Sequence, residues 1–196
     1  MAISQKARAM RSGLLLAAAL MLASCGGSSP ETFDLSPAAV PAARNMSAQI
    51  AIRMPTASLD LESQRILVRT APDTLAYLAG AQWSDQLPAL VQTRLLQTFQ
   101  NAHLIRTVAR AGAGTAADYN LELDIRAFEL DSKAVQANVD IAVKIVAAGS
   151  GRVVGAQIFK TQVPAAGTGG AEATAALNAA LSIVMKQIVA FASAQI

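Results

Sequence analysis

Alternating hydrophobic and polar positions dominate the C-terminal half of the chain. Every second residue from Tyr119 to Ile125 is apolar, which is typical of a strand with one buried face. The alternation changes phase at Ala127–Phe128, where we predict a β-bulge. A second alternating run over 135–145 and a third over 152–163 follow, each after a short turn. The three runs predict an antiparallel meander of long strands.

Helical spacing of apolar residues appears twice. The first run follows Ser84, a candidate N-cap, with Asp85 and Pro88 in the expected first turn. The second covers 171–194 and is rich in alanine. The apolar stripes are Leu87, Leu90, Val91, Leu95 and Phe99 in the first, and Leu177, Leu181, Val184, Met185, Ile188 and Phe191 in the second. Each stripe predicts an amphipathic helix that covers a hydrophobic surface.

Short extended segments precede the first helix. Gln49–Met54 and Arg65–Thr70 contain Ile and Val, and Leu75–Leu78 predicts a third strand ending at Gly80. The order is therefore strands, helix, strands, helix. It predicts an α+β fold with a mostly antiparallel sheet, a C-terminal strand meander and two amphipathic helices packed on one face.

The first 24 residues have the three parts of an export signal. Lys6, Arg8 and Arg11 form a positive head, and Gly13–Ala23 is an uninterrupted run of 11 apolar or small residues. Such a run is shorter than the roughly 20 residues that span a bilayer. We therefore expect a cleaved signal peptide over 1–24.

The chain contains a single cysteine, Cys25, directly after this run. Leu22–Cys25 resembles the bacterial lipobox, which implies cleavage between Ser24 and Cys25, a diacylglycerol on the thiol and an acyl group on the new amine. Several acyl chains on one residue anchor a protein durably, whereas one chain does so only marginally. In enterobacterial lipoproteins, Asp at the next position commonly marks retention at the inner membrane. The resemblance to such lipoproteins, with Gly26 at this position, therefore implies the inner leaflet of the outer membrane, facing the periplasm.

Removal of the signal changes the charge balance. The whole chain carries a net charge of +3, but three basic and no acidic side chains precede Cys25, so the mature chain is neutral. It therefore lacks the clustered basic face of a nucleic-acid-binding protein. Residues 25–47 are rich in Ser, Pro, Gly and Ala, which predicts a lipidated N-terminus and flexible tether before a single domain over 48–196. Within this tether, 32–35 is a candidate edge strand whose formation the sequence leaves open.

Residues suited to catalysis or metal binding are few. His103 is the one histidine and falls at the predicted end of the first helix, without a Gly-x-Ser-x-Gly motif elsewhere. Glu122 and Asp124 point to the solvated face of their strand, and the glycine-rich segments 149–155 and 167–170 lack the context of a phosphate loop. We expect no catalytic residue, metal or cofactor.

Two aromatic residues lie outside the periodic stripes, just before the first helix. Tyr77 and Trp83 either fill the edge of the core or form an aromatic contact point for a partner. The sequence leaves both interpretations open, and we keep the two residues as partner-contact candidates.

Several segments together resemble one known family. They are the lipobox, SLDLESQRILVRTAP at 58–72, LAYLAGAQWSDQLPALVQTRLLQTF at 75–99, ADYNLELDIRAFELD at 117–131 and the alanine-rich last helix. The chain resembles the ABC-type transport auxiliary lipoproteins, which include the paraquat-inducible operon's lipoprotein and are encoded beside MCE-domain proteins. The resemblance implies a non-catalytic component of a lipid or hydrophobic-compound transport system, with an MCE-domain protein and, through it, an ABC permease and ATPase as partners.

Two other functions remain open from the residues alone. One is an envelope-assembly lipoprotein that activates a cell-wall synthase or supports an export pore. The other is a secreted hydrolase using His103. The sequence also leaves open whether copies of the chain form a homo-oligomer.

Overall fold

The fold combines one large sheet with two helices. The computed structural model describes residues 29–41, 48–104, 108–114 and 116–196. In chain order the elements are β1 (Glu31–Phe33), β2 (Ile50–Ile52), β3 (Thr56–Ala57), β4 (Arg65–Ala71), β5 (Thr74–Trp83), α2 (Leu87–Asn101), β6 (Val108–Arg110), β7 (Tyr119–Asp131), β8 (Gln136–Ala147), β9 (Val153–Pro164) and α3 (Gly170–Gln195).

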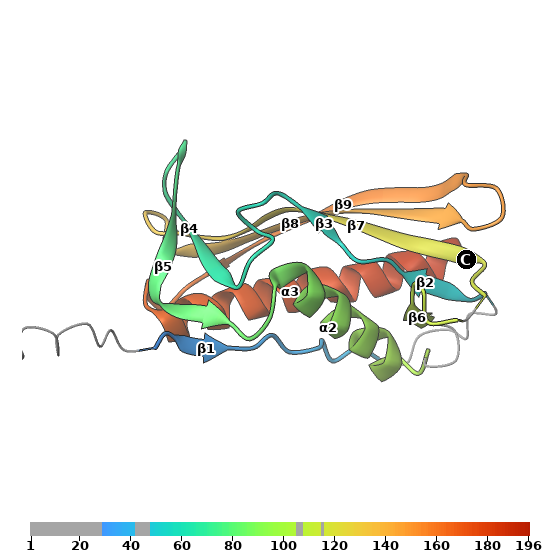
Figure 1. Cartoon of the computed structure of the whole chain (residues 1–196), viewed down its shortest axis with the longest axis horizontal. Helices are drawn as coiled ribbons and strands as arrows, with labels where there is room; N and C mark the ends of the chain where they lie inside the picture. Colours follow the sequence, from blue (N-terminus) through green and yellow to red (C-terminus); the bar gives the residue numbers. More distant parts are fainter. Residues whose placement is uncertain (1–28, 42–47, 105–107, 115) are drawn as a thin grey trace, which may run out of the picture.

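Strand β7 is the centre of the sheet (Figure 1). Along one edge it pairs with β8, which in turn pairs with β9. Along the other edge it pairs successively with β2, β3 and β4. Strand β6 extends the sheet beyond β2, whereas β5 and then β1 extend it beyond β4.

The predicted α+β class and C-terminal meander are confirmed, but the sheet is mixed. The long ladders β7–β8, β8–β9 and β4–β5 are antiparallel. All pairings of β1, β2, β3 and β6, and that of β4 with β7, are parallel. In each of these parallel pairings the two strands are distant in sequence. No tight turn joins them, so the alternation within each strand does not predict whether the pair is parallel or antiparallel.

The predicted bulge in β7 is present. The register with β8 shifts between Ile125 and Ala127, so that Leu121, Leu123 and Ile125 before the shift and Phe128 after it all face the core. Without the extra residue, the apolar side chains after the shift would face solvent.

Helix α3 runs beneath the sheet, with α2 beside it (Figure 1). Helix α3 packs mainly on β8 and β9, whereas α2 packs on α3 and β6. The predicted stripes are buried in both helices, except that Phe191 is half-buried and packs edge-on against Phe159. By length and hydropathy α3 could cross a bilayer, but half of its most apolar window is buried in the domain. We therefore interpret it as the core helix.

Three local predictions need correction. Helix α2 begins at Leu87 with Gln86 at the N-cap, because the Ser84 hydroxyl donates to Asp34 instead of capping the helix. Strand β5 continues past Gly80 to Trp83. Gly80 adopts a φ of 70°, which glycine tolerates, where the register with β4 shifts, so the strand is irregular at this point but does not end. Strand β6 was not predicted, because its three residues carry no alternating pattern.

The described part of the expected tether packs against the domain. We call residues 30–41 the N-terminal strap. Leu35 and Ala38 are 2% and 1% exposed, and β1 pairs with the end of β5. Burial of these side chains holds the strap in place, so the packed unit begins well before residue 48.

A buried ion pair fixes the β4–β5 hairpin to β7. Arg69 Nε lies 2.5 Å from Glu129 Oε1, and Arg69 also donates to Glu129 Oε2 at 3.0 Å. The Glu129 side chain is 6% exposed, whereas that of Arg69 is 31% exposed. The hydrogen bond to Glu129 raises the pKa of the Arg69 guanidinium.

We expect Glu129→Gln to lower the free energy of unfolding by about 2–3 kcal/mol. Removal of one partner from a buried ion pair costs roughly 3–5 kcal/mol, and the partial exposure of Arg69 reduces that cost here. Urea unfolding followed by the fluorescence of Trp83 measures the change. The matched control is Arg53→Gln, which removes an exposed pair with Glu122 at 3.9 Å and should cost about 0–1 kcal/mol. Equal effects of the two substitutions would contradict the assigned role of Glu129.

Candidate functional site: an apolar groove between the N-terminal strap and helix α3

The predicted lipid attachment site lies outside the described residues. Ser24 and Cys25 both fall within 1–28. Cleavage between them and acylation of Cys25 therefore stay predictions.

Trp83 belongs to the core. Its side chain is 1% exposed, and its ring meets that of Phe128 edge-to-face at a centroid distance of 5.9 Å. Its backbone N–H donates to Gln64 O at 2.7 Å. A buried ring cannot touch a docking protein, so the partner-contact interpretation of Trp83 is corrected to the core interpretation.

Tyr77 is half-buried on β5. The Arg65 guanidinium carbon lies 3.5 Å from the centre of its ring, a cation–π arrangement that fixes both side chains. Tyr77 belongs to a hairpin that projects beyond the sheet (Figure 1). It thus remains a partner-contact candidate, and the structure does not bring it together with Trp83.

The other polar candidates form no catalytic cluster within the described ranges. His103 is exposed after α2 with a φ of 63°, and its backbone N–H donates to Gln100 O. Asp124 accepts from Thr56 Oγ1 at 3.3 Å on the outer face of the sheet. Among the residues that the structure places, no three His, Cys, Asp or Glu side chains converge as metal ligands. The segment 149–155 covers the turn between β8 and β9 and the first residues of β9, as the hairpin interpretation predicts.

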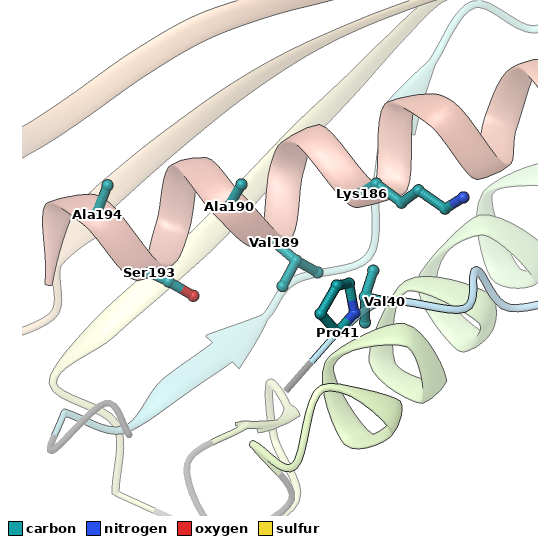
Figure 2. Close-up of a pocket in the computed structure, with 7 residues that line it drawn as sticks. All are labelled: Val40, Pro41, Lys186, Val189, Ala190, Ser193 and Ala194. Atoms are coloured by element: carbon teal, nitrogen blue, oxygen red, sulfur yellow. The ribbon is translucent and has the colours of Figure 1, made fainter. Parts of the chain in front are cut away.

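An apolar groove of about 430 Å³ lies where the strap meets the last turns of α3 (Figure 2). Val40 and Pro41 form one wall, and Val189 points toward them from the helix. The remaining lining residues are Lys186, Ala190, Ser193 and Ala194. All five helical positions recur at three- and four-residue spacing, so one face of α3 supplies them.

Hydrogen bonds to both helices position the strap wall. The Ala38 N–H donates to Thr98 Oγ1 at 3.0 Å, and the Ser36 N–H donates to Asn178 Oδ1 at 2.8 Å. Asn101 Nδ2 donates to Ala38 O at 3.4 Å. These bonds bring Val40 and Pro41 against the C-terminal half of α3.

Asp34 anchors the other end of the strap to α2 through Arg94. Burial raises the pKa of the Asp34 carboxyl, but hydrogen bonds from Arg94, Ser84 and the Leu35 backbone together lower this pKa by a larger amount. The net pKa therefore lies below its ordinary value, and Arg94 is the cation that Asp34 neutralises.

Sequence reasoning missed this groove. It placed Val40 and Pro41 in a flexible tether and gave Lys186 no role. The available signal was the apolar face Val189, Ala190 and Ala194 outside the main stripe of α3. An apolar helix face of this kind predicts a contact, but it does not predict which segment of the chain packs against it.

A protein-family model matches most of the chain. The model of the ABC-type transport auxiliary lipoprotein component matches residues 32–189. The chain belongs to this family. Its match begins inside the N-terminal strap, as expected if the strap is an integral part of the fold.

Individual proteins are similar to this chain in sequence or in structure. The uncharacterized protein bll6063 of Bradyrhizobium diazoefficiens is 32% identical over 150 residues, which are 76% of this chain and 40% of that protein. The crystal structure of protein XCC0632 from Xanthomonas campestris aligns with a TM-score of 0.76 and 26% identity over 86% of this chain and 97% of that one. A second crystal structure, of an uncharacterized protein, shares the fold with a TM-score of 0.66 at 12% identity, covering 83% and 98%.

Proposed function

We propose that this auxiliary lipoprotein is held by acylated Cys25 in the inner leaflet of the outer membrane and serves an ABC transport system that moves lipids or other hydrophobic compounds. Its immediate partner is an MCE-domain protein, through which it acts on the permease and ATPase. The chain itself performs no catalysis. The family match over residues 32–189 carries the proposal.

Two further observations support this assignment. The Leu22–Cys25 segment has the lipobox pattern, and the strap runs from the N-terminal side directly into the packed core through Leu35. The anchor would therefore connect to a rigid part of the domain. The half-buried ring of Tyr77 on the projecting hairpin supplies an aromatic contact for a partner.

Cross-linking in native membranes tests the partner assignment. We expect affinity capture of the full chain to recover an MCE-domain protein together with ABC transport subunits. Tyr77→Ala should reduce the recovery, because it removes the candidate aromatic contact. Ser150→Ala, in the exposed turn between β8 and β9 at the other end of the sheet, serves as the control (Figure 1). Recovery of a cell-wall synthase without an MCE-domain protein would instead favour the envelope-assembly function.

We expect Cys25→Ala to release the chain from the outer membrane without unfolding the domain. The substitution removes the thiol that takes the diacylglycerol, and residue 25 precedes the first buried side chain of the strap. Membrane fractionation and mass spectrometry of the mature N-terminus measure the outcome. An unacylated terminus on the wild-type chain in its native host would refute the anchor.

A further inference from the structure

The groove between the strap and α3 has the size of a small-molecule site. Its volume of about 430 Å³ falls within the roughly 300–1,000 Å³ of pockets that bind small ligands. A stable protein interface involves roughly 20–30 residues on each partner, whereas seven residues line this groove. The groove therefore suits one slender apolar chain better than a docked protein.

Lys186 gives the groove a positive end. It takes part in none of the ion pairs found among the described residues. The only other charged side chain of α3 is Glu172, about four turns away along the helix, and α2 contributes Arg94 but no acidic residue. The nearest acid on the strap, Asp34, is bound to Arg94. An anionic group at Lys186 would thus meet a cation that no described acid neutralises.

Ser193 adds an unsatisfied hydroxyl. Its Oγ is buried and has no hydrogen-bond partner within the described part of the chain. A buried hydroxyl without a partner destabilises the fold, and a ligand oxygen that accepts its hydrogen bond would remove that cost. Ser193 lies seven residues beyond Lys186, or about 10 Å along the helix. Val189 lies between the two (Figure 2).

We propose that this groove binds a single-chain anionic glycerophospholipid. The acyl chain lies against Val40, Pro41 and Val189, the phosphate pairs with Lys186, and an ester or glycerol oxygen accepts from Ser193. This binding goes beyond the proposed function, because it requires no partner protein.

A second depression on α3 offers an internal comparison. It is also mainly apolar, with a volume of about 460 Å³, and Ala179 and Val163 lie in its wall. Its charged residue is Glu172, which would repel a phosphate. The two depressions thus differ in the sign of their charge on one and the same helix.

Photo-labelling in membranes tests the proposal with the full chain. The probe is 1-palmitoyl lysophosphatidylglycerol with a diazirine in its acyl chain, and the uncharged control probe is the corresponding monoacylglycerol. The membranes come from a strain that lacks ABC and MCE partners of this family. Labelling in these membranes therefore reports lipid binding by this chain alone, whether or not the proposed transport function is correct. We expect the charged probe to label residues near 40–41 and 186–194 at least tenfold more than residues 171–179.

The variants separate the contributions of shape and charge. Ala190→Trp fills the groove from an exposed position and should reduce labelling by both probes at least tenfold. Lys186→Glu should reduce labelling by the charged probe at least fivefold and leave the neutral probe within twofold. The matched control Ala179→Trp, exposed on the same helix, should change neither. Lys186 is exposed, so its substitution tests the proposal even if Ala190→Trp fails to fold.

Several outcomes would overturn the proposal. They are an absence of labelling, even labelling along α3, labelling that survives Ala190→Trp in a folded chain, and an unchanged preference for the charged probe in Lys186→Glu. Even labelling would indicate contact with the membrane surface alone.

Discussion

Trp83→Ala is expected to lower the free energy of unfolding by about 3–5 kcal/mol, the usual cost of truncating a large buried aromatic side chain. Trp83 is 1% exposed, and its ring packs edge-to-face on Phe128 of β7 within the core. Its removal loses this contact and leaves a cavity that the surrounding strands cannot fill without shifting. Urea unfolding followed by far-ultraviolet circular dichroism measures the change, since the substitution removes the chain's one tryptophan.

Two substitutions serve as controls for Trp83→Ala. Trp83→Phe keeps a ring against Phe128 and should cost less than half as much. Tyr77→Ala removes a half-buried ring from the same strand and should cost about 1–2 kcal/mol, since less apolar surface is lost. A Trp83→Ala chain with unchanged stability and reduced partner capture would show that Trp83 acts at the surface after all.

Removal of the N-terminal strap is expected to destabilise the domain by at least about 3 kcal/mol. A chain that begins at Ala48 lacks Leu35, which is 2% exposed, and truncation of one such leucine to alanine costs roughly 2–5 kcal/mol. It also leaves Arg94, whose side chain is 16% exposed, without Asp34. The sequence predicts a folded domain that begins at residue 48, whereas the pairing of β1 and the burial of Leu35 include residues from Glu31 onward in the packed unit.

A chain that begins at Ser29 is the reference for this truncation. Leu35→Ala within it should reproduce most of the loss, whereas Ser36→Ala should stay within about 0.5 kcal/mol, because Ser36 contributes its backbone N–H and not its side chain to the bond with Asn178. Thermal unfolding of the four chains gives the comparison. If the chain from Ala48 is as stable as that from Ser29, the strap is a detachable tether.

The candidate groove combines one predictable and one unpredictable wall. The helical wall follows from sequence, because the spacing of Lys186, Val189 and Ser193 puts them on one face of a predicted helix. The strap wall does not, because Val40 and Pro41 occur in a segment rich in Pro, Ser and Ala with no periodic pattern. Its position depends on hydrogen bonds to Thr98 and Asn178, which lie far away in the chain.

The sequence by itself determined the long strands of the meander, the bulge at Ala127, both helices and the family. Alternation and helical spacing reflect burial within single elements, and a chain needs no partner segment to display them. Only the tertiary structure decided the parallel pairing of β2, β3 and β4 along one edge of β7, the burial of Trp83 and the docking of the strap. Each of these depends on contacts between distant segments, and local periodicity does not encode which segments meet or in which direction they run.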